Sequence, residues 1–178
     1  YPHVEYDPDS RTWRAWGLVA PPAEGTYHPD PPDIGNRVIA LWVSDDGLDW
    51  HPWEGQGQGA QDGPWPHVVF AGAVEGCGQI FRDPVETDPQ RRYKAASVIW
   101  AGRDPQGKGH LGQRYELHLI TSPDGIRWQV EDVIHRLSSD TYHGFTYNPH
   151  RQQYQVTLRA NTPDRRIWMA LSDDARTW

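Results

Sequence analysis

The sequence predicts an all-β fold with many turns. Seventeen glycines and sixteen prolines are spread along the 178 residues and interrupt any helical period. Ten tryptophans and eight tyrosines accompany a low mean hydropathy, whereas disordered chains of similar polarity contain few aromatic residues. We therefore expect a folded chain of short strands, whose length allows one domain or two small ones.

The charge balance and the hydropathy argue against two classes of partner. Lysine and arginine total 17 against 24 aspartates and glutamates, a formal net charge of −7, whereas nucleic-acid-binding proteins usually carry a basic patch. No apolar run approaches the ~18 residues of a membrane span, and no signal peptide is visible. Neither nucleic acid nor a membrane span is expected, and the localisation is left unknown. The single cysteine, Cys77, excludes an intrachain disulfide.

A seven-residue pattern, S-x-D-[GA]-x-x-W, occurs three times. The copies span residues 44–50 (SDDGLDW), 122–128 (SPDGIRW) and 172–178 (SDDARTW). Each copy follows an alternating apolar run that predicts a strand: Arg37–Val43, Tyr115–Thr121 and Arg165–Leu171. The Ser and Asp side chains can bind backbone N–H groups, glycine supplies a positive φ, and the tryptophan can cover the hairpin. The pattern therefore predicts a tight turn, although Ala175 replaces the glycine in the third copy.

A second repeated element combines a strand, an Asp-Pro or Asn-Pro turn, and an aromatic residue that opens another strand. The first strand and turn lie at Val4–Pro8, Ile80–Pro84 and Phe145–Pro149. The following strands are expected at Trp13–Ala20, Tyr93–Trp100 and Tyr154–Arg159. The middle copy contains an insertion, because Asp88 and Pro89 repeat the turn signal. Together the two elements define a unit of four strands.

This unit predicts the blade of a β-propeller, in which four-stranded antiparallel sheets surround a channel. The expected blades span about residues 1–54, 68–136 and 140–178. A sandwich or a barrel remains the alternative, because both place turn signals at similar intervals. Propellers need 4–8 blades to close a ring, so we expect the missing blades of the same chain to complete it.

Two segments carry a resemblance to a known group of proteins. They are residues 80–94 (IFRDPVETDPQRRYK) together with 122–128, and residues 140–159 (DTYHGFTYNPHRQQYQVTLR). The chain resembles the five-bladed β-propeller glycoside hydrolases of families 32 and 43 and their unassigned relatives, from Val4 to Trp178. Sialidases match less well, because their Asp box is one residue longer than any copy in this chain.

The resemblance implies hydrolysis of a glycosidic bond in a furanoside or a polysaccharide-derived substrate. One carboxylic acid protonates the leaving oxygen, and a second carboxylate acts as nucleophile or base. In these families such residues project from the innermost strands around the channel. The candidates at the starts of those strands are Glu75 and Asp140. An exposed loop charge and a loop cap, respectively, are the structural alternatives.

A third catalytic candidate is Asp83, because an Arg-Asp-Pro sequence in family 32 carries an aspartate that stabilises the transition state. Here Asp83 follows an apolar pair and aligns with Asp7 and Asn148, so a structural turn is the alternative. The candidate substrate-binding residues are His143, Arg82, His3 and Trp65. Trp65 could stack on a sugar ring, whereas His143 could hold a hydroxyl or be structural.

No cofactor is predicted, and the expected ligand is a carbohydrate. The histidines form no close H-x-x-x-H pair or Cys/His cluster, so no metal site is predicted. A structural calcium is implied only by the resemblance, because it occurs in some relatives. Two rival functions remain open: a non-catalytic propeller that binds carbohydrate or acts as a scaffold, and a sialidase-like enzyme. The latter would need an arginine cluster, for which Arg82, Arg114 and Arg159 are candidates.

Overall fold

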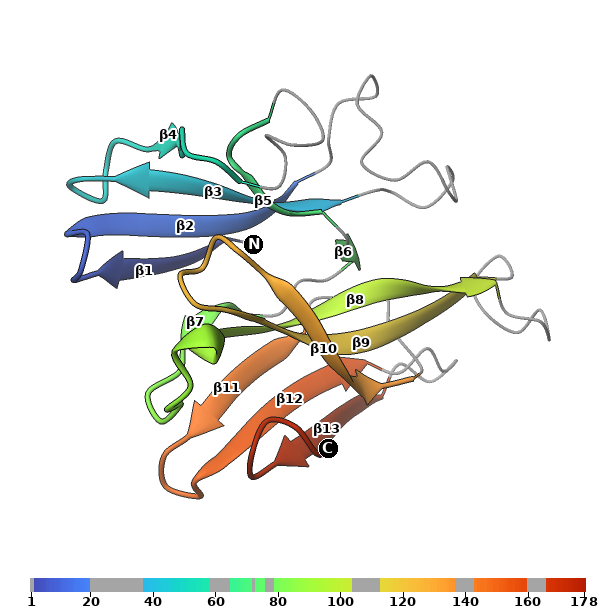
Figure 1. The fold of residues 1–178 in the computed structure, drawn as a ribbon. Helices are drawn as coiled ribbons and strands as arrows, with labels where there is room; N and C mark the ends of the chain where they lie inside the picture. Colours follow the sequence, from blue (N-terminus) through green and yellow to red (C-terminus); the bar gives the residue numbers. More distant parts are fainter. Residues whose placement is uncertain are drawn as a thin grey trace.

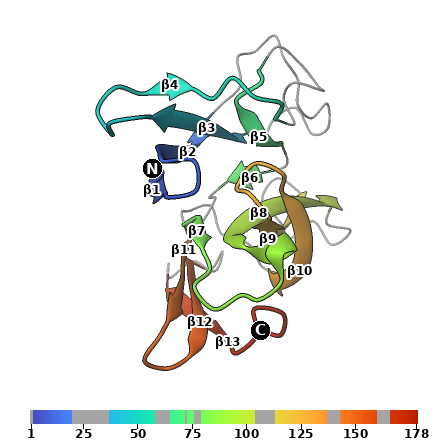
Figure 2. The same ribbon diagram turned by 60° about the vertical axis from the view of Figure 1, so that its left-hand side comes forward.

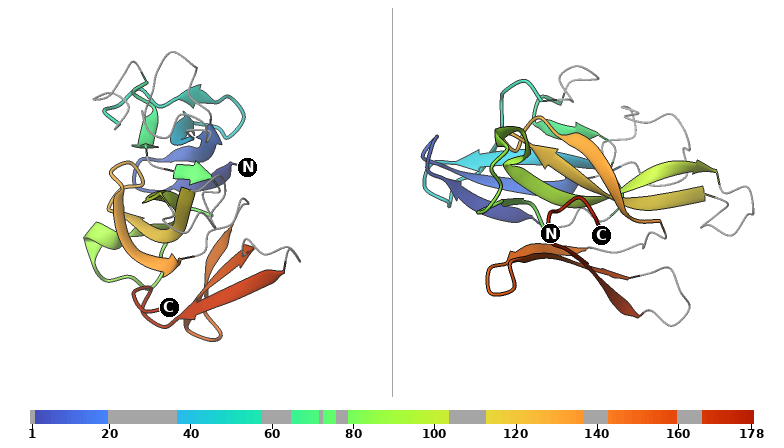
Figure 3. Two further views of the ribbon diagram at one scale, coloured as in Figure 1. Left: turned by 90° about the vertical axis from the view of Figure 1, so that its right-hand side faces the viewer. Right: turned by 60° about the horizontal axis from the view of Figure 1, so that its bottom comes forward.

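The computed structural model consists almost entirely of β-strands, which confirms the all-β class (Figure 1). It describes residues 2–19, 37–57, 65–71, 73–75, 79–103, 113–136, 143–159 and 166–178. In these ranges the only helical element is a single 3₁₀ turn, η1 (Pro89–Arg91). The strands form three antiparallel sheets, which follow one another in chain order (Figure 3).

The first sheet has the strand order β1-β2-β3, followed by a fourth strand in two pieces. Its elements are β1 (His3–Asp7), β2 (Thr12–Val19), β3 (Val38–Ser44), β4 (His51–Pro52) and β5 (Val68–Ala71). Both β4 and β5 pair with β3, the former near its end and the latter near its start. The structure thus places β5, which the sequence assigned to the second blade, at the edge of the first sheet.

The second sheet is also antiparallel and also contains a strand in two pieces, but here the divided strand is the first one and not the last. Its elements are β6 (Ala73–Glu75), β7 (Phe81–Arg82), β8 (Tyr93–Arg103), β9 (Gln113–Ser122) and β10 (Gln129–His135). Both β6 and β7 pair with β8. The third sheet contains β11 (Gly144–Asn148), β12 (Gln153–Arg159) and β13 (Ile167–Ser172).

The edge strands β1, β7 and β11 of the three sheets lie side by side (Figure 2). The ring of Phe81 on β7 packs edge-on against Phe145 on β11, with 5.1 Å between ring centroids. On the other side of β7, the backbone N–H of Arg82 donates to the carboxylate of Glu5 on β1. Side chains on these strands therefore face shared space between neighbouring sheets.

The three S-x-D turns make the same hydrogen bonds. The Ser44, Ser122 and Ser172 hydroxyls each donate to the aspartate two residues on, at 3.0, 3.1 and 3.0 Å. The carboxylates of Asp46, Asp124 and Asp174 each accept the backbone N–H groups two and three residues later, at 2.8–3.0 Å. These hydrogen bonds favour the ionised form of each aspartate and hold the backbone of the turn in place.

The same bonds shift the acidity of the turn aspartates. Backbone N–H groups lower the pKa of Asp46, and they lower that of Asp174 to about 2. Burial opposes the charge on Asp124, but the N–H groups of Arg127 and Ile126 outweigh it and its pKa is also lowered. All three carboxylates therefore remain ionised well into the acid range.

Each of the last two turns docks on the sheet that precedes it. Trp16 Nε1 of the first sheet donates to the Gly125 carbonyl at 2.8 Å, and Arg14 Nη1 donates to the Asp124 carbonyl at 2.9 Å. Arg91 Nη2 of the second sheet donates to the Ala175 carbonyl at 3.2 Å. Two apolar clusters fill the remaining space, one between the first and second sheets and one between the second and third.

Substituting Gly125 by alanine is expected to destabilise the fold by about 2–4 kcal/mol. Its φ is +75°, and an added Cβ would lie 2.7 Å from Cζ2 of Trp16, which is fully buried. The matched control is Ala175→Gly, because Ala175 occupies the same place in the third turn with φ +53°. Urea unfolding should show a change below about 1 kcal/mol for that control, since relief of strain offsets the lost methyl group. Equal effects of the two substitutions would contradict this account of docking.

Candidate functional site

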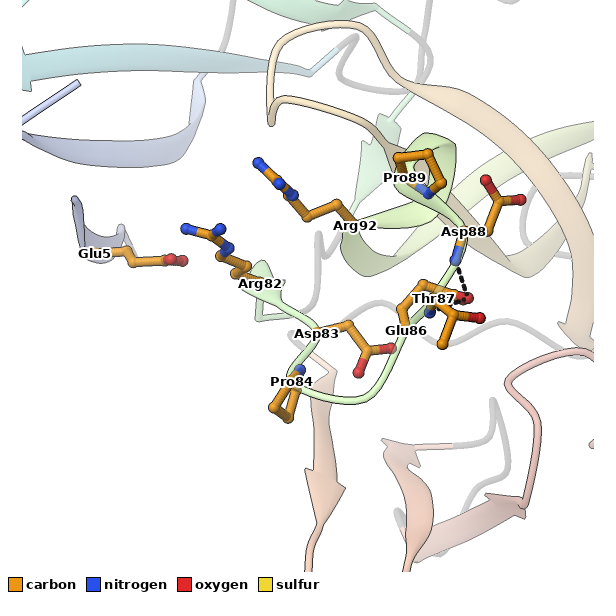
Figure 4. A pocket seen from close by; sticks show the side chains of 9 residues that line it. All are labelled: Glu5, Arg82, Asp83, Pro84, Glu86, Thr87, Asp88, Pro89 and Arg92. Carbon is orange, nitrogen blue, oxygen red and sulfur yellow. Dashed lines mark hydrogen bonds between the residues drawn. The ribbon is translucent and has the colours of Figure 1, made fainter. Parts of the chain in front are cut away.

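A hollow of about 570 Å³ lies where the end of β1 meets β7 and the insertion that follows it (Figure 4). It is lined by Glu5, Arg82, Asp83, Pro84, Glu86, Thr87, Asp88, Pro89 and Arg92. Glu5 comes from the first sheet and the other residues from the second. The volume falls in the range of about 300–1,000 Å³ that is usual for small-molecule sites.

Two arginines of the hollow share one carboxylate. Arg92 Nη1 lies 3.3 Å and Arg82 Nη2 3.5 Å from the same Oδ2 of Asp9, which follows β1. The side chains of Arg82 and Arg92 are 32% and 44% exposed, and that of Asp9 is 64% exposed. In Figure 4 both guanidinium groups extend toward the side on which Glu5 lies.

Glu5 is a carboxylic acid of the hollow whose pKa lies above the ordinary value. Burial raises its pKa, and the nearby N–H and charge of Arg82 offset this only in part. A raised carboxyl pKa is what a general acid needs to hold its proton near neutral pH. The Glu5 carboxylate on β1 is thus a weaker acid than an exposed glutamate.

Asp83 lies at the opposite wall of the hollow and is engaged in a buried network. Its Oδ2 accepts from Lys94 Nζ and from the Tyr154 hydroxyl, each at 2.7 Å. Its Oδ1 accepts the Val85 backbone N–H at 3.0 Å, in the same way that Asp7 accepts from Asp9 at 3.1 Å. These contacts favour the structural turn over a catalytic role for Asp83.

Lys94 joins Asp83 to a wider set of charges. Its ammonium is fully buried and lies 2.7 Å from Glu86 Oε2. Glu86 in turn lies 3.4 Å from Arg91, which forms a 2.7 Å ion pair with Glu131. The ammonium and the N–H of Asp88 outweigh burial and lower the pKa of Glu86. This network connects the insertion of the second sheet to the third sheet.

His3 and Trp65 are not among the residues that line the hollow, although His3 Nε2 lies 4.0 Å from Oε2 of Glu5, which does line it. His3, at the start of β1, stacks on Trp16 with 6.1 Å between centroids, and burial lowers its pKa. Trp65 packs edge-on against His67. Glu75 is the last residue of β6, opposite Val98. Asp140 lies outside the described residues.

His143 directly precedes β11 and is completely buried. Its carbonyl accepts the Gln79 backbone N–H at 3.3 Å, which joins the second and third sheets near the starts of β7 and β11. Within the described part of the chain neither ring nitrogen forms a well-aligned hydrogen bond, and only the backbone of Thr157 approaches the ring. Burial accordingly lowers the pKa of His143 to about 4.

Sequence reasoning did not select Glu5, Asp9 or Arg92. The structure reverses the expected alternation along β1, since His3, Glu5 and Asp7 are partly or fully buried whereas Val4 and Tyr6 are exposed. That reversal of the usual order, with polar residues inside, marks a strand whose inward face is polar.

The arginines proposed for a sialidase-like site have separate partners. Arg82 contacts Asp9, whereas Arg114 donates to the Ala101 carbonyl and lies 3.6 Å from Glu116. Arg159 is the last residue of β12, paired with Ile167. Only Arg82 of these three lines the hollow.

The described residues were also searched for metal ligands and membrane spans. They contain no group of three or more histidine, cysteine, aspartate or glutamate side chains that could hold a metal ion. No helix in the described ranges is long and apolar enough to cross a membrane.

Among the solved structures that share the fold are two whose descriptions name carbohydrate-active proteins. One is an N-acetylgalactosamine deacetylase from F. plautii, crystallised with blood group B trisaccharide. It aligns with a TM-score of 0.54 and 18% identity over 96% of this chain and 49% of its own. The other, described as a glycoside hydrolase, aligns with a TM-score of 0.52 and 14% identity over 97% of this chain and 44% of its own.

At these identities the likeness establishes a common all-β fold. The chain spans about half the length of each of the two structures. No family model matches the sequence, and no curated protein matches it significantly.

Proposed function

We propose that this chain is part of a carbohydrate-active β-propeller, with its three sheets as blades and further sheets of the same protein closing the ring. The likeness to two carbohydrate-active proteins over almost the entire chain carries this proposal. The repeated docking of one sheet's turn on the preceding sheet supports it, because such a step can be continued around an axis.

The reaction we propose is hydrolysis of a glycosidic bond by carboxylates on the innermost strands. The chemistry needs one carboxylic acid to protonate the leaving oxygen and one carboxylate as nucleophile or base. Glu75, the last residue of β6, and Asp140 remain the candidates that the sequence selected. Glu5 joins them as a candidate acid, since it lies on an innermost strand and its pKa is raised by burial.

A non-catalytic carbohydrate-binding propeller is the second candidate, and one observation favours it. Both oxygens of the Asp83 carboxylate are already bound by protein groups, and Glu86 is paired with Lys94. Both carboxylates are thus already engaged by groups of the protein. The hollow could still hold a sugar through its exposed arginines.

Hydrolysis of a panel of aryl-glycosides by the protein tests the enzymatic proposal. Asp140→Asn and Glu75→Gln are each expected to lower kcat by about 10²–10⁴-fold, because this is the usual contribution of a general acid or base. Glu5→Gln should also shift the acid–base profile of kcat, if Glu5 supplies the proton. Asp132→Asn changes an exposed carboxylate on β10 and is the matched control. Unchanged activity in all three variants would refute the catalytic assignment, and saccharide binding without any hydrolysis would support the binding module.

A further inference from the structure

We infer that Arg82 and Arg92 form a binding site for the carboxylate of an acidic sugar, a place that Asp9 of the same chain now occupies. The inference deepens the proposed function. It rests on that function for the ligand being a sugar, whereas the preference for a carboxylate rests on the arginines alone. It starts from the convergence of two guanidinium groups on a single carboxylate oxygen at the mouth of the hollow.

The contacts of Asp9 are longer than those of two short and largely buried ion pairs near the hollow. Charge-assisted N–H···O⁻ bonds normally measure about 2.7–2.9 Å, and Lys94–Asp83 and Arg91–Glu131 reach 2.7 Å. Asp9 is held at 3.3 and 3.5 Å and is largely exposed. Exposed pairs of this kind contribute little to stability, so a ligand could displace Asp9 without disturbing the fold.

The charges around the hollow select the type of anion. Asp83 and Glu86 share the single positive charge of Lys94, and the Asp83 carboxylate points away from the arginines (Figure 4). On the side of the hollow that Arg82 and Arg92 line, the two guanidinium charges are therefore opposed only by the carboxylates of Glu5 and Asp9 among the groups named here. A single negative charge suits this balance, whereas a dianion such as phosphate would be repelled by the acidic lining.

The other groups of the hollow suit a polyhydroxylated ligand. The lining includes the carboxyl groups of Glu5 and Asp88 and the hydroxyl of Thr87, which can accept or donate hydrogen bonds to sugar hydroxyls. Arginine binds a planar carboxylate through two parallel N–H groups, which also fixes its orientation. A uronic acid residue combines a carboxylate, which suits the two arginines, with adjacent hydroxyls, which suit the polar groups of Glu5, Thr87 and Asp88.

Calorimetric titration at low salt tests the inference with four probes: D-glucuronate, D-galacturonate, D-glucose and inorganic phosphate. At least one uronate should bind about tenfold or more tightly than the neutral sugar. Arg82→Gln and Arg92→Gln should each remove this preference, and Asp9→Asn should strengthen uronate binding because the internal competitor loses its charge. Arg151→Gln, in the exposed turn between β11 and β12, should leave binding unchanged. Thermal unfolding of each variant establishes that it is folded.

The outcomes separate this inference from the proposed hydrolysis. Uronate binding that depends on both arginines supports the inference even if no aryl-glycoside is hydrolysed. Equal binding of glucose and the uronates, or phosphate binding tighter than that of either uronate, overturns it even if hydrolysis is observed. Uronate binding that survives both arginine substitutions overturns it as well.

Discussion

Substituting Lys94 by methionine is expected to lower the free energy of unfolding by about 3–5 kcal/mol. The substitution leaves Asp83 and Glu86 facing each other without the buried ammonium that lies 2.7 Å from each. Uncompensated buried charge is among the most destabilising changes known in proteins. Urea unfolding at pH 7, followed by tryptophan fluorescence, measures the loss.

The control for this experiment lies at the same position of the third sheet. Arg14, Lys94 and Gln155 occupy equivalent positions beside Asp7, Asp83 and Asn148, as their strand pairing shows. Gln155→Met removes no charge and should cost less than about 1 kcal/mol. Adding Asp83→Asn to Lys94→Met should recover part of the loss, because it removes one of the stranded charges. A loss no larger than that of Gln155→Met would show that the network is not a stabilising contact.

Replacing His143 by leucine should flatten the acid dependence of stability. The folded pKa of about 4 lies below the ordinary value of 6.5, so the unfolded chain takes up the proton more readily. The stability linked to this histidine is complete above pH 6.5 and is lost as the pH falls toward 4. Full protonation of the unfolded state would cost up to about 3 kcal/mol over that range.

The measured quantity is the difference in unfolding free energy between pH 7 and pH 4.5 for parent and variant. Burial also lowers the pKa values of His3 and His67, so part of the pH dependence should remain in the variant. His150→Gln alters an exposed imidazole and should leave the parent profile in place. A variant as acid-sensitive as the parent would refute the assignment to His143.

The local elements of this fold could be predicted from the sequence because short-range chemistry determines them. The S-x-D pattern contains the donor and acceptor groups that form the turn, and the structure shows those bonds in all three copies. The Asp-Pro pattern likewise identified the turn at Asp83. In the third S-x-D turn Ala175 takes the place of glycine and adopts the left-handed backbone conformation, with φ +53°.

The parts that could not be predicted depend on contacts between distant segments. Nothing near Val68 reveals that β5 completes the first sheet, because its register is set by apolar pairing with Val38 and Ile39. Glu5 resembles any polar residue of an alternating strand until Arg82 is placed beside it. The candidate site is likewise a product of docking, since its walls come from two sheets.

That docking also bears on how the chain folds. Within each sheet most strands pair with the next strand along the chain, and β3–β5 and β6–β8 skip a single short strand, so each sheet can form from nearby residues. The bonds between sheets join residues far apart: 109 positions for Trp16–Gly125, 84 for Arg91–Ala175 and 71 for Tyr154–Asp83. Contacts of such separation form late, because the loop entropy must be lost before they stabilise the fold. The hollow between the first two sheets is therefore among the last parts of the molecule to acquire its shape.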